Sequence, residues 1–353
     1  KPSGVWIMAY TTIDDPSAYF QTAVWTGNGS TQSIAFAGNS DLQPDFLWVK
    51  GRSLAEGHTL QDSVRGVTKH LHSQNTDAEV TDTGIVTAFN SDGFSLGDEG
   101  DVNANTSTFV GWGWKTGTAF SNDASSTSVG SIDSAGSVNT TSGFSIITYT
   151  GTGSAATVAH GLGVAPKLII NRTISAAKEW DVYYGDPTDY LVLNTTAATA
   201  DASDKWNDTA PTSTVWSIES SSQNNTSGGT CLAYCFAEKK GFSKIGSYTG
   251  NGNANGNFIY LGFKPAFILL KGTANTEDWS IYDNKRLGYN VDNNVLASNS
   301  SAAELTDDNI DLLSNGFKIR RQTGLLNDAQ NYIFMAFAEQ PFVTSTGIPT
   351  TAR

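Results

Sequence analysis

Four acidic side chains crowd a glycine-rich stretch of the sequence, and their chemistry suits a hard cation. Asp92, Asp98, Glu99 and Asp101 all fall within SDGFSLGDEGDVNAN at residues 91–105. Carboxylate oxygens on flexible loops are ligands that Ca2+ prefers, although this spacing is not that of an EF-hand loop. A plain solvated acidic loop is the alternative. The sequence therefore predicts no cofactor, with Ca2+ as the alternative that these carboxylates would allow.

Two sets of aromatic residues have the chemistry to stack on sugar rings. The first set is Trp180, Tyr183 and Tyr184, and the second is Trp279 and Tyr282. Both sets lie in polar segments, so we expect their rings to be partly exposed, with one apolar and one wet side. These five residues are the candidates for ligand contact.

Three histidines are candidates for a metal site near the start of the chain. His70 and His72 are two residues apart and would point to one face of a strand, and His58 would complete a set of three ligands. The alternative is that they are surface or hydrogen-bonded histidines. A nucleophile elbow requires a strand-to-helix turn in an α/β sheet, which the sequence does not predict. We predict that the protein is not an enzyme and has no catalytic residues.

The elements that must position these residues occur three times. A strand led by proline appears as PDFLWVK (44–50), PKLIIN (166–171) and PAFILLK (265–271). A TGxG turn precedes each of them, at residues 26–29, 150–153 and 249–252. An apolar run bounded by turn residues predicts a strand that is buried on both faces, with Leu47, Ile169 and Ile268 in the core. Self-similarity at this scale defines the folding unit.

Each repeat closes with an apolar and aromatic strand. These strands are FVGWGWK (109–115), CLAYCFAE (231–238) and YIFMAFAE (332–339). Trp112 and Trp114 alternate with glycines, so both point to one face, which we expect to be a sandwich core. Cys231 and Cys235 share a strand about 13 Å apart, too far for a disulfide, which predicts free buried thiols.

The coarse pattern predicts an all-β fold of three tandem antiparallel β-sandwich domains. Short runs separated by Gly, Asn, Asp and Ser are typical of such sandwiches. In the first repeat we expect strands at residues 22–25, 32–36, 46–50, 59–61, 85–89, 94–96 and 108–114. Asp62 and Arg65 are expected to form a structural pair that braces the turn before Gly66.

The repeats divide the chain into six parts. The expected parts are an N-terminal arm (1–21), sandwich 1 (22–116), a Ser/Thr/Gly-rich connector that belongs to neither repeat (117–142), sandwich 2 (143–241), sandwich 3 (242–343) and a C-terminal tail (344–353). Met8 has the sequence context of a translation start, which would make residues 1–7 upstream sequence. The tail is expected to lie along a neighbour or to stay mobile.

Charge and hydropathy narrow the classes of partner. The chain has 34 Asp and Glu against 21 Lys and Arg, a net charge of −13. Such a field opposes a phosphate backbone, so we predict no nucleic-acid partner. No apolar run approaches the length of a membrane-spanning helix, so we predict no membrane insertion.

Several segments resemble a known class of viral proteins. MAYTTIDDPSAYFQT, LQPDFLWVKGR, LQDSVRG, SDGFSLG, VGWGWK and MAFAEQPFVTSTGIPTTAR are similar to segments of repeat-bearing, tail-fibre-like structural proteins of tailed bacteriophages, especially marine ones. The resemblance implies jelly-roll domains of the concanavalin or laminin-G type and carries no catalytic residues with it. The second and third repeats depart from it, since they lack DSVRG and the GWGWK glycines.

The sequence thus predicts a non-enzymatic structural protein on the surface of a phage particle, assembled in the host cytoplasm. It would act as a fibre, decoration protein or adhesin, presenting loops for host attachment or assembly. Expected partners are other virion proteins, further copies of the chain, with a trimer favoured, and a host surface glycan. The alternative is an array of carbohydrate-binding modules from a secreted bacterial protein. A polysaccharide-degrading enzyme is a third class, but it needs paired carboxylates that the sequence does not assign.

Overall fold

The computed structural model describes residues 10–287, 290, 293–307 and 310–350. The expected translation start at Met8 and the upstream residues 1–7 lie outside them. Nearly every element in the described part is an antiparallel strand, which confirms the all-β sandwich fold. Within the same part, no helix is long and apolar enough to cross a membrane.

The first repeat is a sandwich of a larger and a smaller sheet. Its elements are η1 (Pro16–Ala18), β1 (Phe20–Thr26), β2 (Gln32–Ile34), β3 (Phe46–Gly51), β4 (Thr59–Asp62), β5 (Lys69–His70), β6 (Val80–Thr81), β7 (Val86–Phe89), β8 (Phe94–Leu96), α1 (Gly100–Asn103) and β9 (Thr108–Trp114). The larger sheet has the order β1-β9-β3-β4 and the smaller one β2-β8-β7. The strands expected at residues 94–96 and 108–114 have those bounds.

The second repeat has the largest sheet, because it includes the expected connector. Its elements are β10 (Thr118–Asn122), α2 (Ala124–Thr127), β11 (Ser134–Asn139), β12 (Phe144–Thr150), β13 (Ala156–Ala159), β14 (Leu168–Thr173), β15 (Asp181–Tyr183), β16 (Asp189–Val192), β17 (Ala200–Asp201), α3 (Ser203–Trp206), β18 (Val215–Ile218) and β19 (Thr230–Phe236). The order is β10-β11-β12-β19-β14-β15-β16-β17, with β13-β18 as the second layer. The prediction that residues 117–142 belong to neither repeat was therefore wrong, since β10 and β11 extend this sheet through backbone hydrogen bonds that any side chain permits.

The third repeat follows the second without a linker. Its strands are β20 (Ser243–Thr249), β21 (Phe258–Tyr260), β22 (Phe263–Gly272), β23 (Ser280–Asp283), β24 (Asn293–Ala297), β25 (Leu305–Asp307), β26 (Ile310–Leu313), β27 (Gly316–Ile319) and β28 (Asn331–Pro341). The larger sheet has the order β20-β28-β22-β23-β24-β25, and β21-β27-β26 forms the other layer.

The proline-led strand and the closing strand are neighbours in every repeat. β3 pairs with β9, β14 with β19, and β22 with β28, all antiparallel. Leu47, Ile169 and Ile268 are fully buried, as predicted. Cys231 and Cys235 are buried free thiols on one face of β19, also as predicted.

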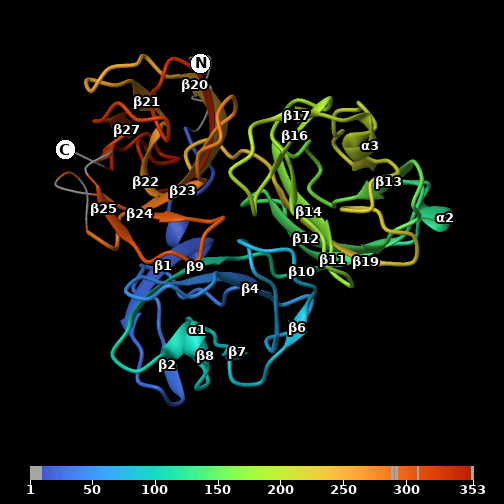
Figure 1. Ribbon diagram of the computed structural model, residues 1–353, viewed down its shortest axis with the longest axis horizontal. Helices are drawn as coiled ribbons and strands as arrows, with labels where there is room; N and C mark the ends of the chain where they lie inside the picture. The colour runs from blue at the N-terminus through green and yellow to red at the C-terminus, as the bar shows by residue number, and fades with distance from the viewer. Residues whose placement is uncertain (1–9, 288–289, 291–292, 308–309, 351–353) are drawn as a thin grey trace, which may run out of the picture.

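The strands are buried on both faces because each large sheet separates two cores. One face of β3 packs Leu47 and Val49 into the core of its own sandwich. The other face directs Phe46 and Trp48 into a core that all three repeats share. Figure 1 shows the consequence: the repeats form three lobes around a common centre, rather than a row. The chain therefore folds as a closed ring with approximate threefold symmetry.

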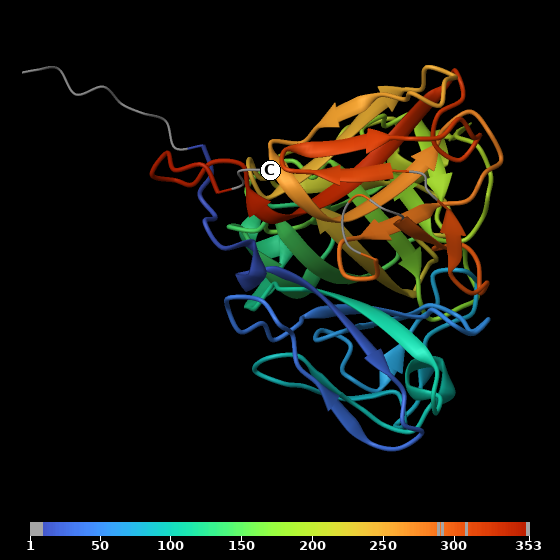
Figure 2. The same ribbon diagram turned by 90° about the vertical axis from the view of Figure 1, so that its left-hand side faces the viewer.

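Both ends of the described chain lie on the same side of this ring (Figure 2). The Asp14 carboxylate accepts hydrogen bonds from the backbone N–H and the hydroxyl of Ser345. Tyr10 donates to the carbonyl of Gly262 at 2.9 Å. The N-terminal arm is therefore fixed to the third repeat, and the described part of the tail packs against that arm.

Candidate functional site

Buried histidine, tryptophan, cationic and acidic side chains form hydrogen bonds across the seams, the surfaces where two repeats meet. One such position lies 14 residues after the proline of each repeat and holds His58, Trp180 or Trp279 (58 − 44, 180 − 166 and 279 − 265). Trp180 Nε1 donates to the carbonyl of His72 in repeat 1 at 2.8 Å, and Trp279 Nε1 donates to that of Val192 in repeat 2 at 3.0 Å.

His58 makes the equivalent bond at the third seam. Its Nε2 lies 2.9 Å from the carbonyl oxygen of Ala297 in repeat 3, and its Nδ1 accepts the indole N–H of Trp48 at 2.9 Å. This arrangement assigns the proton to Nε2 and the lone pair to Nδ1. Complete burial, together with the positive charge of Lys50, holds the pKa of His58 well below its ordinary value.

A buried cation occupies a second equivalent position, six residues after each proline (50 − 44, 172 − 166 and 271 − 265). Lys50, Arg172 and Lys271 have no exposed surface. Each donates to backbone carbonyls of its own repeat. Each also donates to the preceding repeat of the ring: Lys50 to Ser301 at 3.2 Å, Arg172 to Thr76 and Asp77 at 2.8 Å each, and Lys271 to Thr196 at 3.1 Å. Burial lowers the pKa of Lys50 and of Lys271 to about 8 and that of Arg172 to about 10. These cations therefore serve as cross-links between repeats.

An ion pair forms the seam between the first two repeats. Asp62 Oδ2 accepts Arg65 Nε at 2.6 Å and the hydroxyl of Tyr234 from repeat 2 at 2.9 Å. Its Oδ1 accepts the backbone N–H groups of Val64 and Arg65, which confirms the predicted turn. Burial alone would lower the pKa of Arg65, but the Asp62 carboxylate raises it above its ordinary value. Burial and the same carboxylate raise the pKa of Tyr234 well above its ordinary value.

An equivalent acid–arginine pair, with a donor from the facing repeat, lies at the seam between repeats 3 and 1. Asp283 Oδ2 accepts Arg286 Nε at 2.7 Å and the indole N–H of Trp112 from repeat 1 at 3.1 Å. Glu304 accepts from both Arg286 and Arg52, and these guanidinium groups lower its pKa although burial alone would raise it.

The remaining seam, between repeats 2 and 3, has no such pair at the matching positions. Tyr184 stands where Asp62 and Asp283 stand in their repeats, and Pro187 replaces the arginine. The residue that corresponds to Tyr234 and Trp112 is Met335, since each pairs with the fourth residue after the proline of its own repeat. Met335 has no strong hydrogen-bond donor.

An aromatic triangle lies where the three large sheets meet. Trp114, Phe236 and Phe337 are equivalent residues of the closing strands and are all buried. Their ring centroids are 5.6 Å apart for Trp114 and Phe337, 5.9 Å for Phe236 and Phe337, and 6.5 Å for Trp114 and Phe236. Trp112 and Trp114 are buried on one face, as predicted, but that face belongs to the core shared by all three repeats and not to the core of their own sandwich.

The aromatic candidates for ligand contact are not exposed as expected. Trp180, Tyr183, Trp279 and Tyr282 are at most 4% exposed, and Tyr184 is half-buried. The expectation of partial exposure was therefore wrong for these four residues and holds for Tyr184. Trp180 and Trp279 are buried against a neighbouring repeat, whereas Tyr183 packs on Trp206 in the core of its own sandwich. Trp180 and Trp279 serve as hydrogen-bond donors across a seam.

The acidic candidates for Ca2+ are spread over different contacts. Asp92 accepts the backbone N–H of Leu42, and Glu99 accepts the N–H of Gly100 at the start of α1. Asp98 and Glu99 line an open hollow of about 420 Å3 together with Asp82. Burial raises the pKa of Asp101, which faces Glu56 and His72 instead. Among the described residues, no group of three or more acidic, His or Cys residues forms a metal site.

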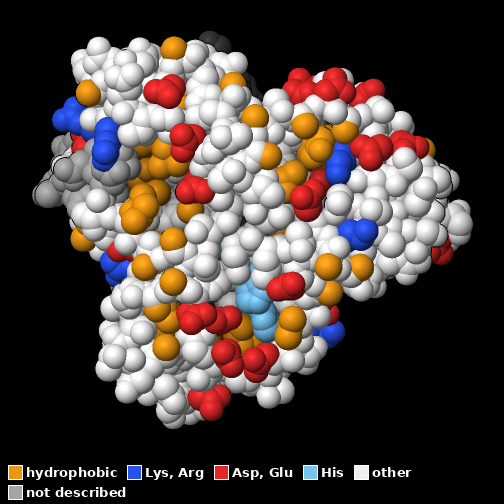
Figure 3. Space-filling view, in the orientation of Figure 1, with side chains coloured by type: hydrophobic (Ala, Val, Ile, Leu, Met, Phe, Trp, Pro, Cys, Tyr) orange, Lys and Arg blue, Asp and Glu red, His pale blue; other side chains and the backbone are white. Residues whose placement is uncertain are grey.

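His70 and His72 lie close together in the first repeat, where His70 is buried and His72 is half-buried. In Figure 3 histidine and acidic side chains gather on its lobe. The rings of His70 and His72 are 5.0 Å apart, and burial lowers the pKa of His70 to about 4. His58 has both ring nitrogens occupied, so it does not join them as a metal ligand.

One serine has the spacing of a nucleophile elbow but not its structure. Ser95 lies in GFSLG, yet it belongs to strand β8, whereas an elbow serine occupies a strand-to-helix turn. Its hydroxyl is hydrogen-bonded to Ser33 at 2.9 Å and to Asn90. The structure therefore assigns it to strand pairing.

Sequence reasoning missed the seam residues as a set. The cations of the second equivalent position follow the apolar run of each strand, where a polar residue is ordinarily a strand end. The signal was present, because a cation recurs at one offset from the proline in all three repeats. Nothing in local periodicity shows that such a residue meets another repeat.

Comparison with known proteins gives a family. The model of a family described as a domain of unknown function (DUF7483) matches residues 15–341. No curated protein and no solved structure matched the chain.

Proposed function

The chain belongs to the DUF7483 family, and we propose that it is a non-enzymatic structural protein on the surface of a bacteriophage particle. The observation that supports this proposal is the closed ring of repeats. His58, Lys50 and the Asp62–Arg65 pair have the chemistry of active-site groups, yet they bind across seams. Their role is to hold three sandwiches in a fixed orientation.

A rigid ring suits a particle component that presents loops. The shared core lies at the centre, and the smaller sheet of each repeat lies on the outer side of its lobe (Figure 1). Substitutions in outer loops leave the seams intact, so such loops can vary while the ring is conserved. We propose that these loops contact other virion proteins or a host surface.

The resemblance to tail-fibre-like proteins supports the particle assignment. A threefold site on a virion can be filled by a homotrimer or by one copy of a chain that is itself approximately threefold. Copy number separates these two arrangements. A homotrimer places three copies of the chain at each threefold site, whereas the approximately threefold monomer places one.

Purified particles provide the test. We expect quantitative mass spectrometry of phage particles from a lysate to find the protein in fixed ratio to the major capsid protein, and antibody labelling to place it on the surface. Its absence from particles that contain all other structural proteins would contradict the proposal. Release of reducing ends from host polysaccharide by the pure protein would contradict its non-enzymatic nature.

A further inference from the structure

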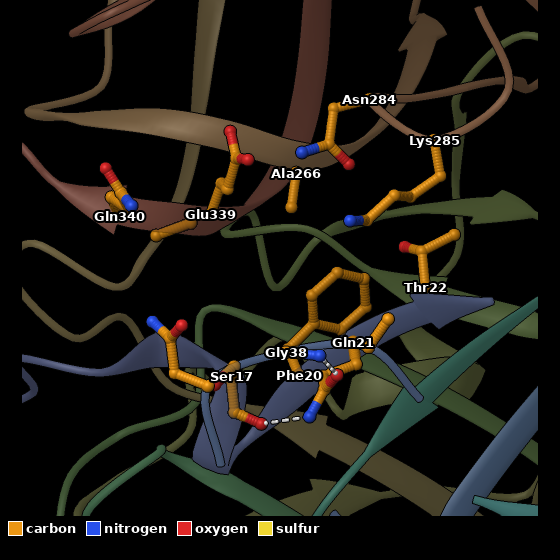
Figure 4. Close-up of a pocket in the computed structure, with 13 residues that line it drawn as sticks. Ser17, Phe20, Gln21, Thr22, Gly38, Ala266, Asn284, Lys285, Glu339 and Gln340 are labelled. Carbon is orange, nitrogen blue, oxygen red and sulfur yellow. Dashed lines mark hydrogen bonds between the residues drawn. The ribbon is translucent and has the colours of Figure 1, made fainter. Parts of the chain in front are cut away.

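A hollow of about 140 Å3 lies at the seam between repeats 1 and 3 (Figure 4). Repeat 1 lines it with Phe20, Thr22 and residues 37–39, and repeat 3 lines it with the start of β22, the turn after β23 and the end of β28. None of the candidate residues from the sequence lies there. The hollow is therefore distinct from the predicted ligand and metal sites, and it adjoins the ion pair of the same seam, since the backbone N–H of Lys285 donates to Asp283 Oδ1 at 3.0 Å.

Asn284 is the first sign that this hollow binds something. Its side chain is 95% buried (5% exposed), and neither its amide nitrogen nor its amide oxygen has a hydrogen-bond partner. Figure 4 shows the amide directed into the hollow, beside Lys285. The hydroxyl of Thr22, in the opposite wall, is also buried without a partner. Unpaired buried groups are costly, so native sites generally satisfy them.

The first repeat shows what is missing from the third. Asn284 corresponds to Ser63, and Ala266 corresponds to Asp45, since both pairs share the same backbone bond: Asn284 N to the Ala266 carbonyl at 3.1 Å and Ser63 N to the Asp45 carbonyl at 2.8 Å. In repeat 1 the Asp45 carboxylate accepts Ser63 Oγ at 2.8 Å and the N–H of Thr116 at 2.9 Å. In repeat 3 a methyl group stands in place of that carboxylate.

We propose that the hollow binds the carboxylate of an acidic sugar, which takes the place that the Asp45 carboxylate has in repeat 1. Asn284 Nδ2 and the ammonium group of Lys285 donate to the carboxylate. Glu339 lines the same hollow and is paired with Lys264 at 2.8 Å. Its carboxylate accepts a sugar hydroxyl and disfavours a doubly charged anion such as phosphate. A ligand with both a carboxylate and hydroxyls, such as a uronic acid, matches both the donors Asn284 and Lys285 and the acceptor Glu339.

Binding of small probes to the intact chain tests this site. We expect D-glucuronate to bind, D-glucose not to bind, and acetate to bind more weakly than glucuronate, by titration calorimetry at constant ionic strength. Absence of glucuronate binding would overturn the proposal and leave a water-filled hollow. Equal binding of glucose would exclude the carboxylate contact, and equal binding of acetate would contradict the assignment to a sugar.

Two variants locate the binding. Lys285→Met removes an exposed cation and should weaken glucuronate binding at least about tenfold, the loss of one charge-assisted hydrogen bond. Lys240→Met, a matched change of an exposed lysine outside the hollow, should leave it unchanged. Equal loss in both variants, or none in Lys285→Met, would overturn the proposal.

Ala266→Asp supplies the missing carboxylate from within the chain. It should abolish glucuronate binding and raise the melting temperature, because Asn284 gains a partner. A variant that still binds glucuronate as the original chain does would overturn the proposal, as would a lower melting temperature in a folded variant. This site does not depend on location in a virion, since particle composition and glucuronate binding are measured separately.

Discussion

Two of the three seams contain an acid–arginine pair, and the third has Tyr184 and Pro187 at the matching positions. Where repeat 1 or repeat 3 offers Asp62 or Asp283, the facing repeat offers Tyr234 or Trp112 as a donor. Where repeat 2 offers Tyr184, the facing position is Met335, whose side chain needs no acceptor. Donor and acceptor thus occur together or are absent together.

This difference indicates what the polar residues specify. The apolar core is common to all seams, so burial alone does not choose the direction in which the repeats follow one another. In the opposite direction, Met335 would face the Asp62–Arg65 pair and leave Asp62 without its donor from a neighbour. A buried ion pair adds little net stability but penalises the wrong partner. We infer that the ion pairs select the direction of the ring.

Removing an acid should have the largest effect. Asp62→Ala leaves Arg65 Nε and the Tyr234 hydroxyl buried without their acceptor, so we expect a loss of about 3 kcal/mol in the free energy of unfolding. Guanidinium denaturation measures it. Asp41→Ala, at an exposed position, is the control and should change stability by less than about 0.5 kcal/mol. Equal effects of the two substitutions would show that the seam does not depend on its ion pair.

Acid should weaken the seam that contains His58. The pKa of this histidine is lower in the folded than in the unfolded chain, so its contribution to stability is present above the unfolded value of about 6.5 and is lost as the pH falls below it. At pH 5 the loss for this group is at most about 2 kcal/mol, the value for a histidine that stays neutral in the folded chain. His58→Gln removes the titration, so the variant should lose less stability than the original chain between pH 7.5 and pH 5, by denaturation at both values. The same loss in both proteins would contradict the prediction.

Removing one donor should have a smaller effect than removing its acid. Tyr234→Phe deletes the hydroxyl but leaves Asp62 paired with Arg65, so we expect about 1.5 kcal/mol from one hydrogen bond to a charged group. A double-mutant cycle with Asp62→Ala measures the coupling between the two residues. Additive effects would mean that the hydroxyl and the carboxylate act independently.

The seam without an ion pair should be the least sensitive. The Tyr184 hydroxyl is hydrogen-bonded within its own repeat, to Asp189 and Thr199, and is only half-buried. We expect Tyr184→Phe to cost at most about 1 kcal/mol, measured by the same denaturation. A loss as large as that of Asp62→Ala would remove the distinction between the seams.

Much of each repeat was predictable from local sequence. The strands at residues 94–96 and 108–114, the core positions of the proline-led strands and the Asp62–Arg65 turn follow from apolar runs and turn residues. The connector was not predictable in the same way. Its polar strand β11 pairs with the edge of β12, and β10 pairs with β11, through backbone hydrogen bonds that leave little trace in the side-chain pattern.

The seam residues mark the limit of sequence reasoning. A strand that is apolar on both faces is predicted to be buried on both, but its sequence does not show which elements pack against each face. The second cover of β3 is contributed by residues more than a hundred positions away, such as Tyr234, whose ring lies 4.3 Å from that of Phe46. Exposure of Trp180 and Trp279 was mispredicted for the same reason, since their polar neighbours face another repeat.

The sequence by itself determined three sandwich repeats, their strands and the residues that each strand buries, because these depend on periodicity and turn chemistry among neighbouring residues. The tertiary structure decided that the repeats close into a ring, that aromatic and cationic side chains lie at its seams, and that Asn284 faces a hollow. Those outcomes depend on which sheet faces pack together, and local sequence patterns do not show whether the surfaces of two distant segments are complementary.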